Sequence, residues 1–169
     1  MISPINRAFI DSVDPKTIDV KIISAEDFCE AELDELWSFV GKKGNQRWLW
    51  VAIDRKTRFV LAYTFGRRQD KVFRKLKELL EPFSITMYYT DDWGSYARNL
   101  NPESHTISKK NTQAVERKNL TFRTRIKRLA RKTICFSKST VMHDIVIGLV
   151  INIIEFGLTP FMAVHGLRA

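Results

Sequence analysis

The stretch LDELWSFVGKKGNQRWLWVAI, residues 33–53, holds two runs of strand-forming residues on either side of a turn. Aromatic and aliphatic residues dominate residues 33–40 and 47–53, whereas the glycine- and lysine-rich segment 41–45 is typical of a turn. After a polar turn at residues 54–57, residues 59–65 form a third run of the same kind. Because connections this short join antiparallel neighbours, the sequence predicts a three-stranded meander.

The hydrophobic period changes after the meander. Apolar residues at helical spacing over residues 72–80 predict a helix, which Pro82 ends. Residues 85–90 then form another strand, which runs directly into Asp91, and a short strand is predicted at residues 105–108. A strand reached through a helical crossover lies parallel to a strand already in the sheet. We therefore expect a mixed sheet.

Two more helices complete the predicted order. The segment 112–132 has an apolar stripe at helical spacing, and the run 145–154 is too short and too interrupted to span a bilayer, so it predicts a buried helix. The order βββ-α-β-α-(β)-α is that of the ribonuclease H-like α/β fold, a mixed five-stranded sheet flanked by helices. Without a repeat or a flexible linker, we expect one domain over residues 29–169 and an N-terminal arm over residues 1–28.

The charge balance favours a polyanionic partner. Twenty-eight Lys and Arg against nineteen Asp and Glu give a net charge of +9 and a pI near 9.7. Cys29 and Cys135 form no CxxC pair, which argues against a zinc site or a disulfide framework, and no secretory signal opens the chain. We therefore expect an intracellular protein with no membrane partner.

Three acids occupy unusual positions. Asp34 interrupts an apolar strand, where an ionised carboxylate is costly unless it is paired or binds a metal. Asp91 follows the fourth strand, and Glu116 is the single acid among ten Lys and Arg between Lys109 and Lys132. If the first and fourth strands are neighbours, the two aspartates lie side by side, and the following helix can bring Glu116 across to them. Such a group suits two Mg²⁺ or Mn²⁺ ions and phosphoryl displacement.

Each acid also has an ordinary structural explanation. Asp34 could pair with an arginine or lie on a solvated edge, Asp91 could cap a turn or a helix, and Glu116 could form ion pairs along its helix. Asp92 competes with Asp91 for the second position, but Asp91 comes directly off the strand. The joint placement of the three acids favours a site.

The segment from Arg117 to Lys132 carries eight basic residues in sixteen. It is either a solvated helix face or a surface that follows a phosphate backbone. The near absence of acids argues against a self-neutralised face, so we expect contact with DNA.

Six segments of the chain, taken in order, closely resemble the InsB-type transposase of the insertion sequence one family. The likeness covers residues 29–157 and includes a gap of 24 residues between Asp91 and Glu116. Two positions depart from the family pattern: Lys118 stands where a histidine is expected, and Asp92 stands where a glycine is expected. The segments are residues 31–41, 46–49, 90–93, 107–113, 116–120 with Arg123, and 136–139 with His143 and Asp144.

The resemblance implies a DDE transposase that cuts the 3′ ends of a transposon and joins them to target DNA. By motif match, Asp34, Asp91 and Glu116 would be the catalytic residues and would hold two Mg²⁺ (or Mn²⁺) ions. The residues expected to support the site or contact double-stranded DNA are Arg117, Lys118, Asn119, Arg123, Lys127 and Arg131.

The resemblance also implies partners for the chain. Members of this family usually act as a fusion with an upstream zinc-finger and helix-turn-helix segment, of which residues 1–30 show no pattern, and we expect a homo-oligomer on DNA in the prokaryotic cytoplasm. Two alternatives stay open at this point. One is a non-catalytic DNA-binding regulator that corresponds to a truncated transposase frame, and the other is a different ribonuclease H-like nuclease.

Overall fold

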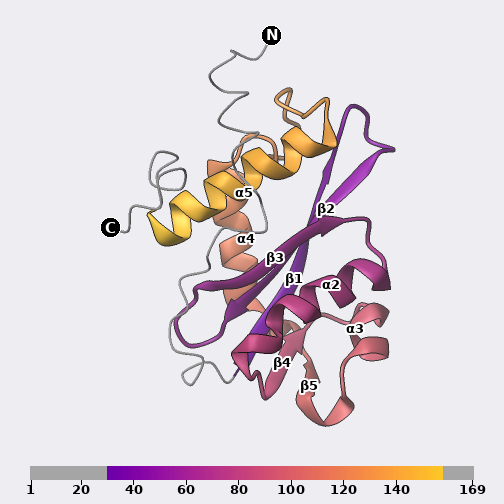
Figure 1. The fold of residues 1–169 in the computed structure, drawn as a ribbon, viewed down its shortest axis with the longest axis vertical. Helices are drawn as coiled ribbons and strands as arrows, with labels where there is room; N and C mark the ends of the chain where they lie inside the picture. The colour runs from indigo at the N-terminus through magenta and orange to yellow at the C-terminus, as the bar shows by residue number, and fades with distance from the viewer. Residues whose placement is uncertain (1–29, 158–169) are drawn as a thin grey trace.

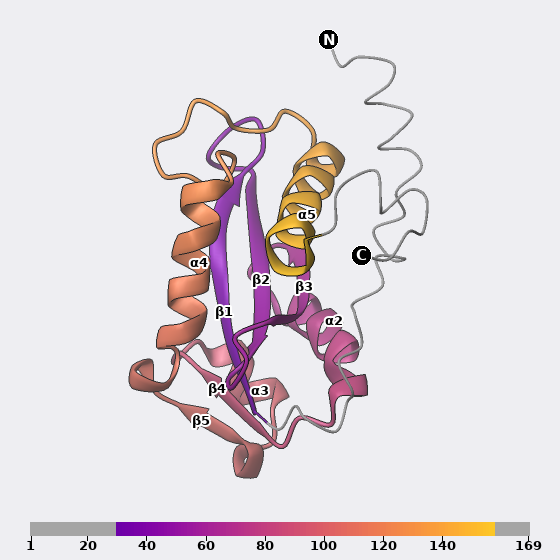
Figure 2. The same cartoon turned by 90° about the vertical axis from the view of Figure 1, so that its left-hand side faces the viewer.

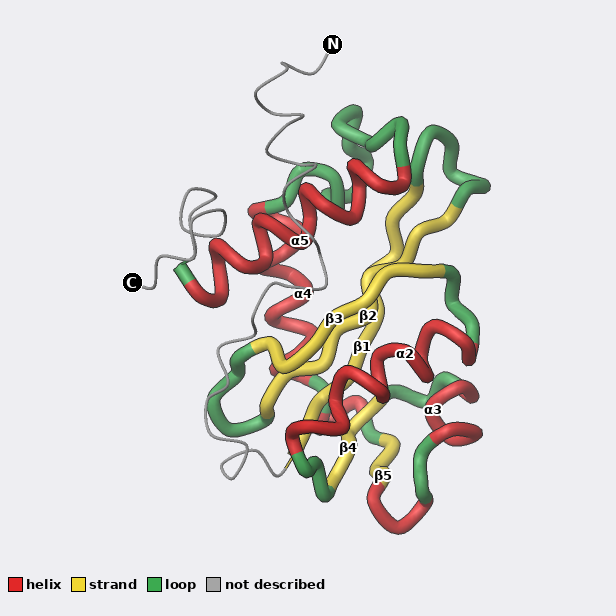
Figure 3. Tube along the Cα trace, in the orientation of Figure 1, coloured by secondary structure: helices red, strands yellow, loops and turns green. Residues whose placement is uncertain are grey.

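The computed structural model describes residues 30–157, which form a five-stranded sheet with helices on both faces (Figures 1 and 3). The predicted N-terminal arm, residues 1–28, lies outside the described residues. In the described part, no helix is long and apolar enough to cross a membrane. The elements are β1 (Glu30–Phe39), β2 (Gln46–Asp54), β3 (Val60–Gly66), α2 (Asp70–Leu80), β4 (Met87–Thr90), α3 (Gly94–Asn99), β5 (His105–Ile107), α4 (Gln113–Arg125) and α5 (Thr140–Phe156), with single 3₁₀ turns at Glu81–Phe83, Pro102–Ser104 and Lys109–Asn111.

The order of strands across the sheet is β3-β2-β1-β4-β5. The first three strands pair antiparallel, which confirms the predicted meander, and β4 pairs parallel to β1 and to β5. The strand reached through the α2 crossover is therefore parallel to its neighbours, as predicted, and it lies beside the first strand, which meets the condition set for bringing Asp34 and Asp91 together. This order and these directions are those of the ribonuclease H-like fold, so the predicted fold class is confirmed.

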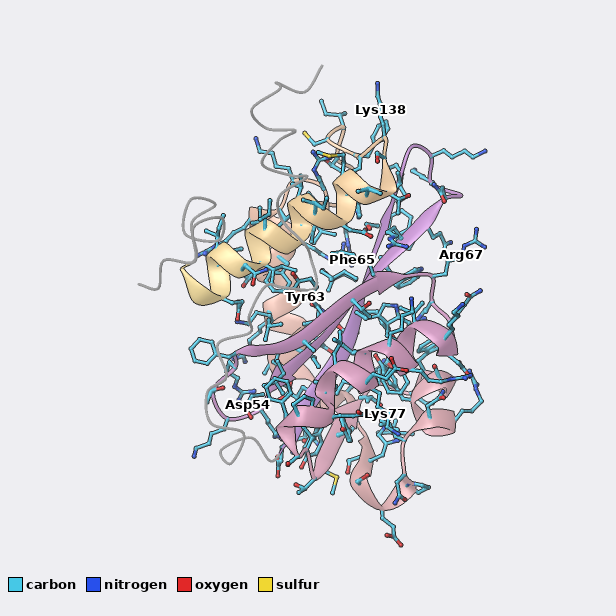
Figure 4. The ribbon with its side chains drawn as sticks, in the orientation of Figure 1. Asp54, Tyr63, Phe65, Arg67, Lys77 and Lys138 are labelled. Carbon is cyan, nitrogen blue, oxygen red and sulfur yellow. The ribbon has the colours of Figure 1, made fainter. Side chains whose placement is uncertain are left out.

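The helices α2 and α3 lie on one face of the sheet and α4 and α5 on the other (Figures 1 and 2). Each face carries a separate hydrophobic core. One core joins α2 and α3 to side chains such as Leu33 and Trp50. The other joins α4 and α5 to the opposite face, where Leu36 is buried and Tyr63 and Phe65 point from β3 toward α5 (Figure 4). Because side chains alternate along a strand, neighbouring residues of β1 reach different cores.

The predicted helix over residues 112–132 is too long, because α4 ends at Arg125. Residues 126–132 form turns that still bury Ile126 and Leu129, and the Arg123 guanidinium Nη1 donates a hydrogen bond to the Leu129 carbonyl at 3.2 Å. Residues 125–132 contain five basic residues and no acid, so a continued helix would set like charges one turn apart with no opposite charge to offset them. The residues of the predicted apolar stripe are buried, but Ile126 and Leu129 reach the core from turns that follow the helix.

Candidate metal and nucleic-acid site

The pairing of β1 with β4 brings Asp34 and Asp91 to the same level of the sheet. The two strands pair in register from Glu30 with Met87 to Glu32 with Tyr89, and two further residues along each strand lead to Asp34 and Asp91. Oxygen atoms of Asp34, Glu35 and Asp91 all lie within 4.8 Å of one another. The structure therefore brings two of the three predicted acids together and adds Glu35, which is not among the predicted site residues.

Asp34 lies on the face of the sheet that α4 covers. Its carboxylate accepts a hydrogen bond from the Asn119 side-chain amide at 2.7 Å. Burial raises the pKa of Asp34 to about 6, against hydrogen bonds from the Glu35 backbone and Asn119, and the charges of Asp91 and Glu116 raise it further. A bound cation would remove this penalty on the ionised form.

Glu35 approaches the same cluster from the other face. Burial raises its pKa to about 7, although the charge of Arg68 opposes this rise. The Arg68 guanidinium lies 3.1 Å from the Glu35 carboxylate and 3.7 Å from that of Asp91, and it stacks on Trp93 at 4.6 Å from the ring centre. One arginine thus serves two carboxylates. No spacing rule reveals this contact, because strand alternation assigns Glu35 to the face opposite Asp34.

Asp91 both shapes a turn and joins the cluster. Its Oδ1 accepts a hydrogen bond from the Trp93 backbone N–H at 3.0 Å, and about a third of its side chain is exposed. Asp92 is exposed and is not part of the acidic group. Of the two neighbouring aspartates, the structure therefore places Asp91 with Asp34.

Glu116 lies outside the group of close carboxylates. It is exposed on the first turn of α4, where the Thr112 hydroxyl donates to it at 3.3 Å. Asn119, which contacts Asp34, is one turn further along the same face, and the charge of Glu116 contributes to the raised pKa of Asp34. Glu116 therefore lies on the side of α4 that contacts Asp34, but outside the group of close carboxylates.

Glu32 fixes the position of α4 on the sheet. This buried side chain accepts hydrogen bonds from the backbone N–H groups of Ala114 and Val115 at 2.9 and 3.0 Å, and from Arg58 at 3.0 Å. A carboxylate at a helix N-terminus satisfies free donors and complements the helix dipole. Because Glu32 and Asp34 lie on the same face of β1, this cap sets the strand that carries Asp34 against the helix that carries Glu116. The sequence shows only another acid in the strand.

The residues predicted to contact DNA occupy three kinds of environment. Arg117, Lys127 and Arg131 are exposed. Lys118 instead donates to both carboxylate oxygens of buried Glu155 at 2.8 Å, which ties α4 to α5. Asn119 holds Asp34, and Arg123, whose pKa is lowered mainly by burial, closes the turn after α4. Only the first three present free charge to a partner.

A mixed sheet of order β3-β2-β1-β4-β5 with clustered carboxylates where β1 meets β4 places the chain in the ribonuclease H-like class. Residues 28–157 match the model of the IS1 transposase family. The chain belongs to this family.

Curated relatives agree with this assignment. The insertion element iso-IS1n protein InsB of Shigella dysenteriae is 60% identical over 117 residues, which cover 69% of this chain and 89% of that protein. The IS1 4 protein InsB of Escherichia coli K12 is 46% identical over 123 residues, or 73% of this chain and 74% of that protein. The IS1 protein InsB of Shigella sonnei is 45% identical over 123 residues, or 73% and 94%.

Proposed function

We propose that this protein is a DNA transposase that cuts transposon ends and joins them to target DNA, with Asp34, Asp91 and Glu116 holding two divalent cations. The observation that carries the proposal is the convergence of Asp34 and Asp91 in a chain of the IS1 transposase family. Glu116 is included because it lies one turn before Asn119 on the helix that is bonded to Asp34 through Asn119.

The residues present fit hard divalent cations. The group offers carboxylate oxygens alone, which Mg²⁺ and Mn²⁺ prefer over nitrogen or sulfur ligands. Burial disfavours the charged forms of Asp34 and Glu35. The single guanidinium of Arg68 is shared between Glu35 and Asp91, so the three carboxylates have less positive charge beside them than their ionised forms would need. When bound, two such ions would activate the attacking oxygen and stabilise the leaving oxygen of an in-line displacement.

The reaction comprises two displacements at phosphorus. In the first, a water oxygen bonds to the phosphorus at the transposon end, the bond to the 3′ oxygen breaks, and a 3′ hydroxyl is released. In the second, that hydroxyl oxygen bonds to a target phosphorus, and a target 3′ oxygen leaves with the proton. One phosphodiester forms as another breaks, so the joining step needs no nucleotide cofactor.

The chain's own residues orient the site and the DNA. The Asn119 amide fixes one oxygen of Asp34, and Arg68 holds Asp91 near Asp34. Arg117, Lys127 and Arg131 are exposed and would contact backbone phosphates. Lys118 is not included in this surface, because Glu155 already binds its ammonium group.

The proposal extends to the partners and organisation of the protein. Residues 29–169 would act as one catalytic domain on double-stranded DNA in the bacterial cell, as a homo-oligomer and together with an upstream zinc-finger and helix-turn-helix segment that recognises the transposon ends. The family match supports this extension.

The test compares single isosteric variants of the three acids in a cleavage and strand-transfer assay with Mg²⁺ or Mn²⁺. Asp34→Asn, Asp91→Asn and Glu116→Gln should each lose roughly a thousandfold or more of activity, as expected when a ligand of a catalytic metal is neutralised. DNA binding without metal should persist in all three. Asp92→Asn is the matched control, since it removes the neighbouring exposed charge and should retain activity.

Different outcomes identify the other candidates. Retained activity in Glu116→Gln would remove that residue from the metal-binding set. Cleavage without joining would indicate a nuclease, and DNA binding without cleavage would indicate a regulator.

A further inference from the structure

A basic cavity lies on the side of α4 that faces away from the carboxylate cluster. It has a volume of about 320 Å³, and its walls come from Glu32 on β1, the β2–β3 turn, the 3₁₀ turn before α4, and α4 between Gln113 and Thr121. Asp54, labelled in Figure 4, marks the end of β2 at which this turn begins. We call it the basic pocket; the charged residues that line it are Glu32, Arg55, Arg58, Lys110, Arg117 and Lys118.

The helix itself separates the basic pocket from the acids. Glu116, Asn119 and Arg123 follow one another at spacings of three and four, on the face of α4 toward Asp34. Arg117 and Thr121, which are four residues apart, lie on a different face and line the pocket. The pocket is therefore a second location for charge recognition, distinct from the metal cluster.

The pocket keeps excess positive charge after its internal pairs are counted. Its single acid, Glu32, already accepts from Arg58 and from two backbone N–H groups. Lys118 is bound to Glu155. Lys110 and Arg117 form no ion pair within residues 30–157, and both are exposed. A site with free ammonium and guanidinium groups suits an anion with several oxygens.

Arg55 supplies a preorganised donor to the same pocket. Its guanidinium stacks on Tyr89 at 3.9 Å from the ring centre, donates a hydrogen bond to Asn111 at 3.3 Å, and pairs through Nε with the Glu30 carboxylate at 3.5 Å. The Nη1 atom of Arg55 is buried and has no hydrogen-bond partner among residues 30–157. A planar donor that is held in place and left unsatisfied is typical of a phosphate-binding arginine.

We propose that the basic pocket binds a phosphate of the DNA backbone, so that α4 lies between two contacts to the same duplex. One contact is the phosphodiester at the carboxylates, and the other is a phosphate held by Arg55, Lys110 and Arg117. An α-helix is about 10–12 Å across and the major groove is about 12 Å wide, so one helix can separate two phosphates of a duplex. The inference rests on the proposed function for the identity of the polyanion.

The test removes two unpaired positive charges from the basic pocket and compares the DNA affinity of this variant with that of a variant that loses two positive charges at another place on the surface. The variant is Lys110→Ala with Arg117→Ala. The matched control is Lys42→Ala with Lys43→Ala, which removes two exposed charges from the β1–β2 turn. DNA affinity is measured by fluorescence anisotropy at several chloride concentrations without metal, and thermal unfolding confirms that both proteins are folded.

The pocket variant should bind DNA about tenfold more weakly near 0.1 M salt, and its salt slope should fall by about one, because the phosphate contact that the pocket makes is lost. The control should change less in both quantities. Equal losses in the two variants, or none in either, would overturn the proposal.

A competition experiment separates DNA from free phosphate. At matched ionic strength, inorganic phosphate should displace DNA from the wild type more than chloride does, and this difference should disappear in the pocket variant. Phosphate competition with unchanged DNA affinity in the variant would mean that the pocket takes free phosphate, which overturns the assignment to DNA. A wild type that cleaves DNA while the pocket variant binds normally would overturn this inference alone and leave the proposed function intact.

Discussion

The two faces of the sheet hold their helices by different interactions. On the α2/α3 face, the rings of Trp50, Phe73 and Tyr96 pack with centres 5.0–6.2 Å apart, and apolar burial fixes the helices. On the α4/α5 face the core is mostly aliphatic around Phe122, and buried polar contacts cross it. These are Glu32 with the α4 N-terminus, Asn119 with Asp34, Lys118 with Glu155, and His143 between Ser38 and Ser137.

The stability of the fold and the position of its helices depend on different interactions. Apolar burial is roughly proportional to area and tolerates small shifts, whereas a buried hydrogen bond is lost if its partner moves by an ångström. The helix that carries Glu116 lies on the face with buried polar contacts. We infer that apolar burial on both faces stabilises the fold, and that the polar contacts on the α4/α5 face set the position of the helix that carries Glu116.

The largest expected effect is on the aromatic face. Phe73 is fully buried against Trp50 and Tyr96, so Phe73→Ala should lower the free energy of unfolding by about 3–5 kcal/mol. Urea denaturation measures this change, and Phe59→Ala, at a residue that is 40% exposed, is the control with a much smaller loss. An equal loss of unfolding free energy in Phe73→Ala and Phe59→Ala would refute the role assigned to the aromatic core.

The second effect is an acid sensitivity of the polar face. Burial, with the charges of Arg128 and Arg47, lowers the pKa of His143 from 6.5 to about 4. The unfolded chain therefore binds this proton at a higher pH than the folded chain does. Stability is unaffected above pH 6.5 and should fall by about 3 kcal/mol as the pH drops from 6.5 to 4.

A His143→Gln variant isolates this contribution, because every other titrating group remains. The free energy of unfolding, measured between pH 4 and 7, should depend less steeply on pH in the variant. Parallel curves for the two proteins would show that His143 is not responsible.

The hydrogen bonds of His143 explain why a second proton on its imidazole is costly. Ser38 donates to the Arg47 carbonyl, so its oxygen accepts a hydrogen bond from Nε2 of His143, while Nδ1 of His143 accepts one from the Ser137 hydroxyl. Protonation of Nδ1 would remove that acceptor and disrupt the chain of hydrogen bonds.

The third prediction concerns the position of α4 on the sheet. Glu32→Gln should lower the free energy of unfolding by about 1–3 kcal/mol, since an amide can replace only part of a carboxylate that accepts from two backbone N–H groups and Arg58. The cleavage rate of the folded protein should fall as well, because α4 loses its anchor on β1. Phe73→Ala, assayed where it remains folded, should not show this second loss.

Glu30→Gln is the matched control for Glu32. It removes a carboxylate from the same strand, but one that is 43% exposed and 3.5 Å from Arg55. A cleavage rate that is equally reduced in both variants would mean that charge near the site, and not the helix cap, is what matters.

The smallest effect is expected for the exposed ion pair on the aromatic face. Asp70 on α2 accepts two hydrogen bonds from Arg98 on α3, and the Arg98 contact lowers the pKa of Asp70. Because solvent screens this pair, Asp70→Asn should destabilise the protein less than the other three changes do. Thermal unfolding at low and high salt is the measurement, and any difference from the wild type should disappear at high salt.

The meander, the parallel fourth strand and the meeting of Asp34 with Asp91 were predictable, because they follow from hydrophobic period, connection length and strand ends. The start of β1 was not. Glu30 and Glu32 are poor strand formers, yet β1 begins at Glu30, where the Glu32 carboxylate is satisfied by Arg58 and the α4 N-terminus. The same limit applies to Glu35, whose partner Arg68 lies 33 residues away along the chain.

By itself, the sequence determined the α/β class, the order of the strands along the chain and two acids of the carboxylate cluster, because local period and turn chemistry act over a few residues. Only the tertiary structure decided that α4 stops at Arg125, that Lys118 pairs with Glu155, and that Glu35 joins the aspartates. These outcomes depend on pairs of groups that are far apart in the chain. The energy of a buried charge is set by the partner that the fold brings to it, and the sequence pattern does not contain that partner's position.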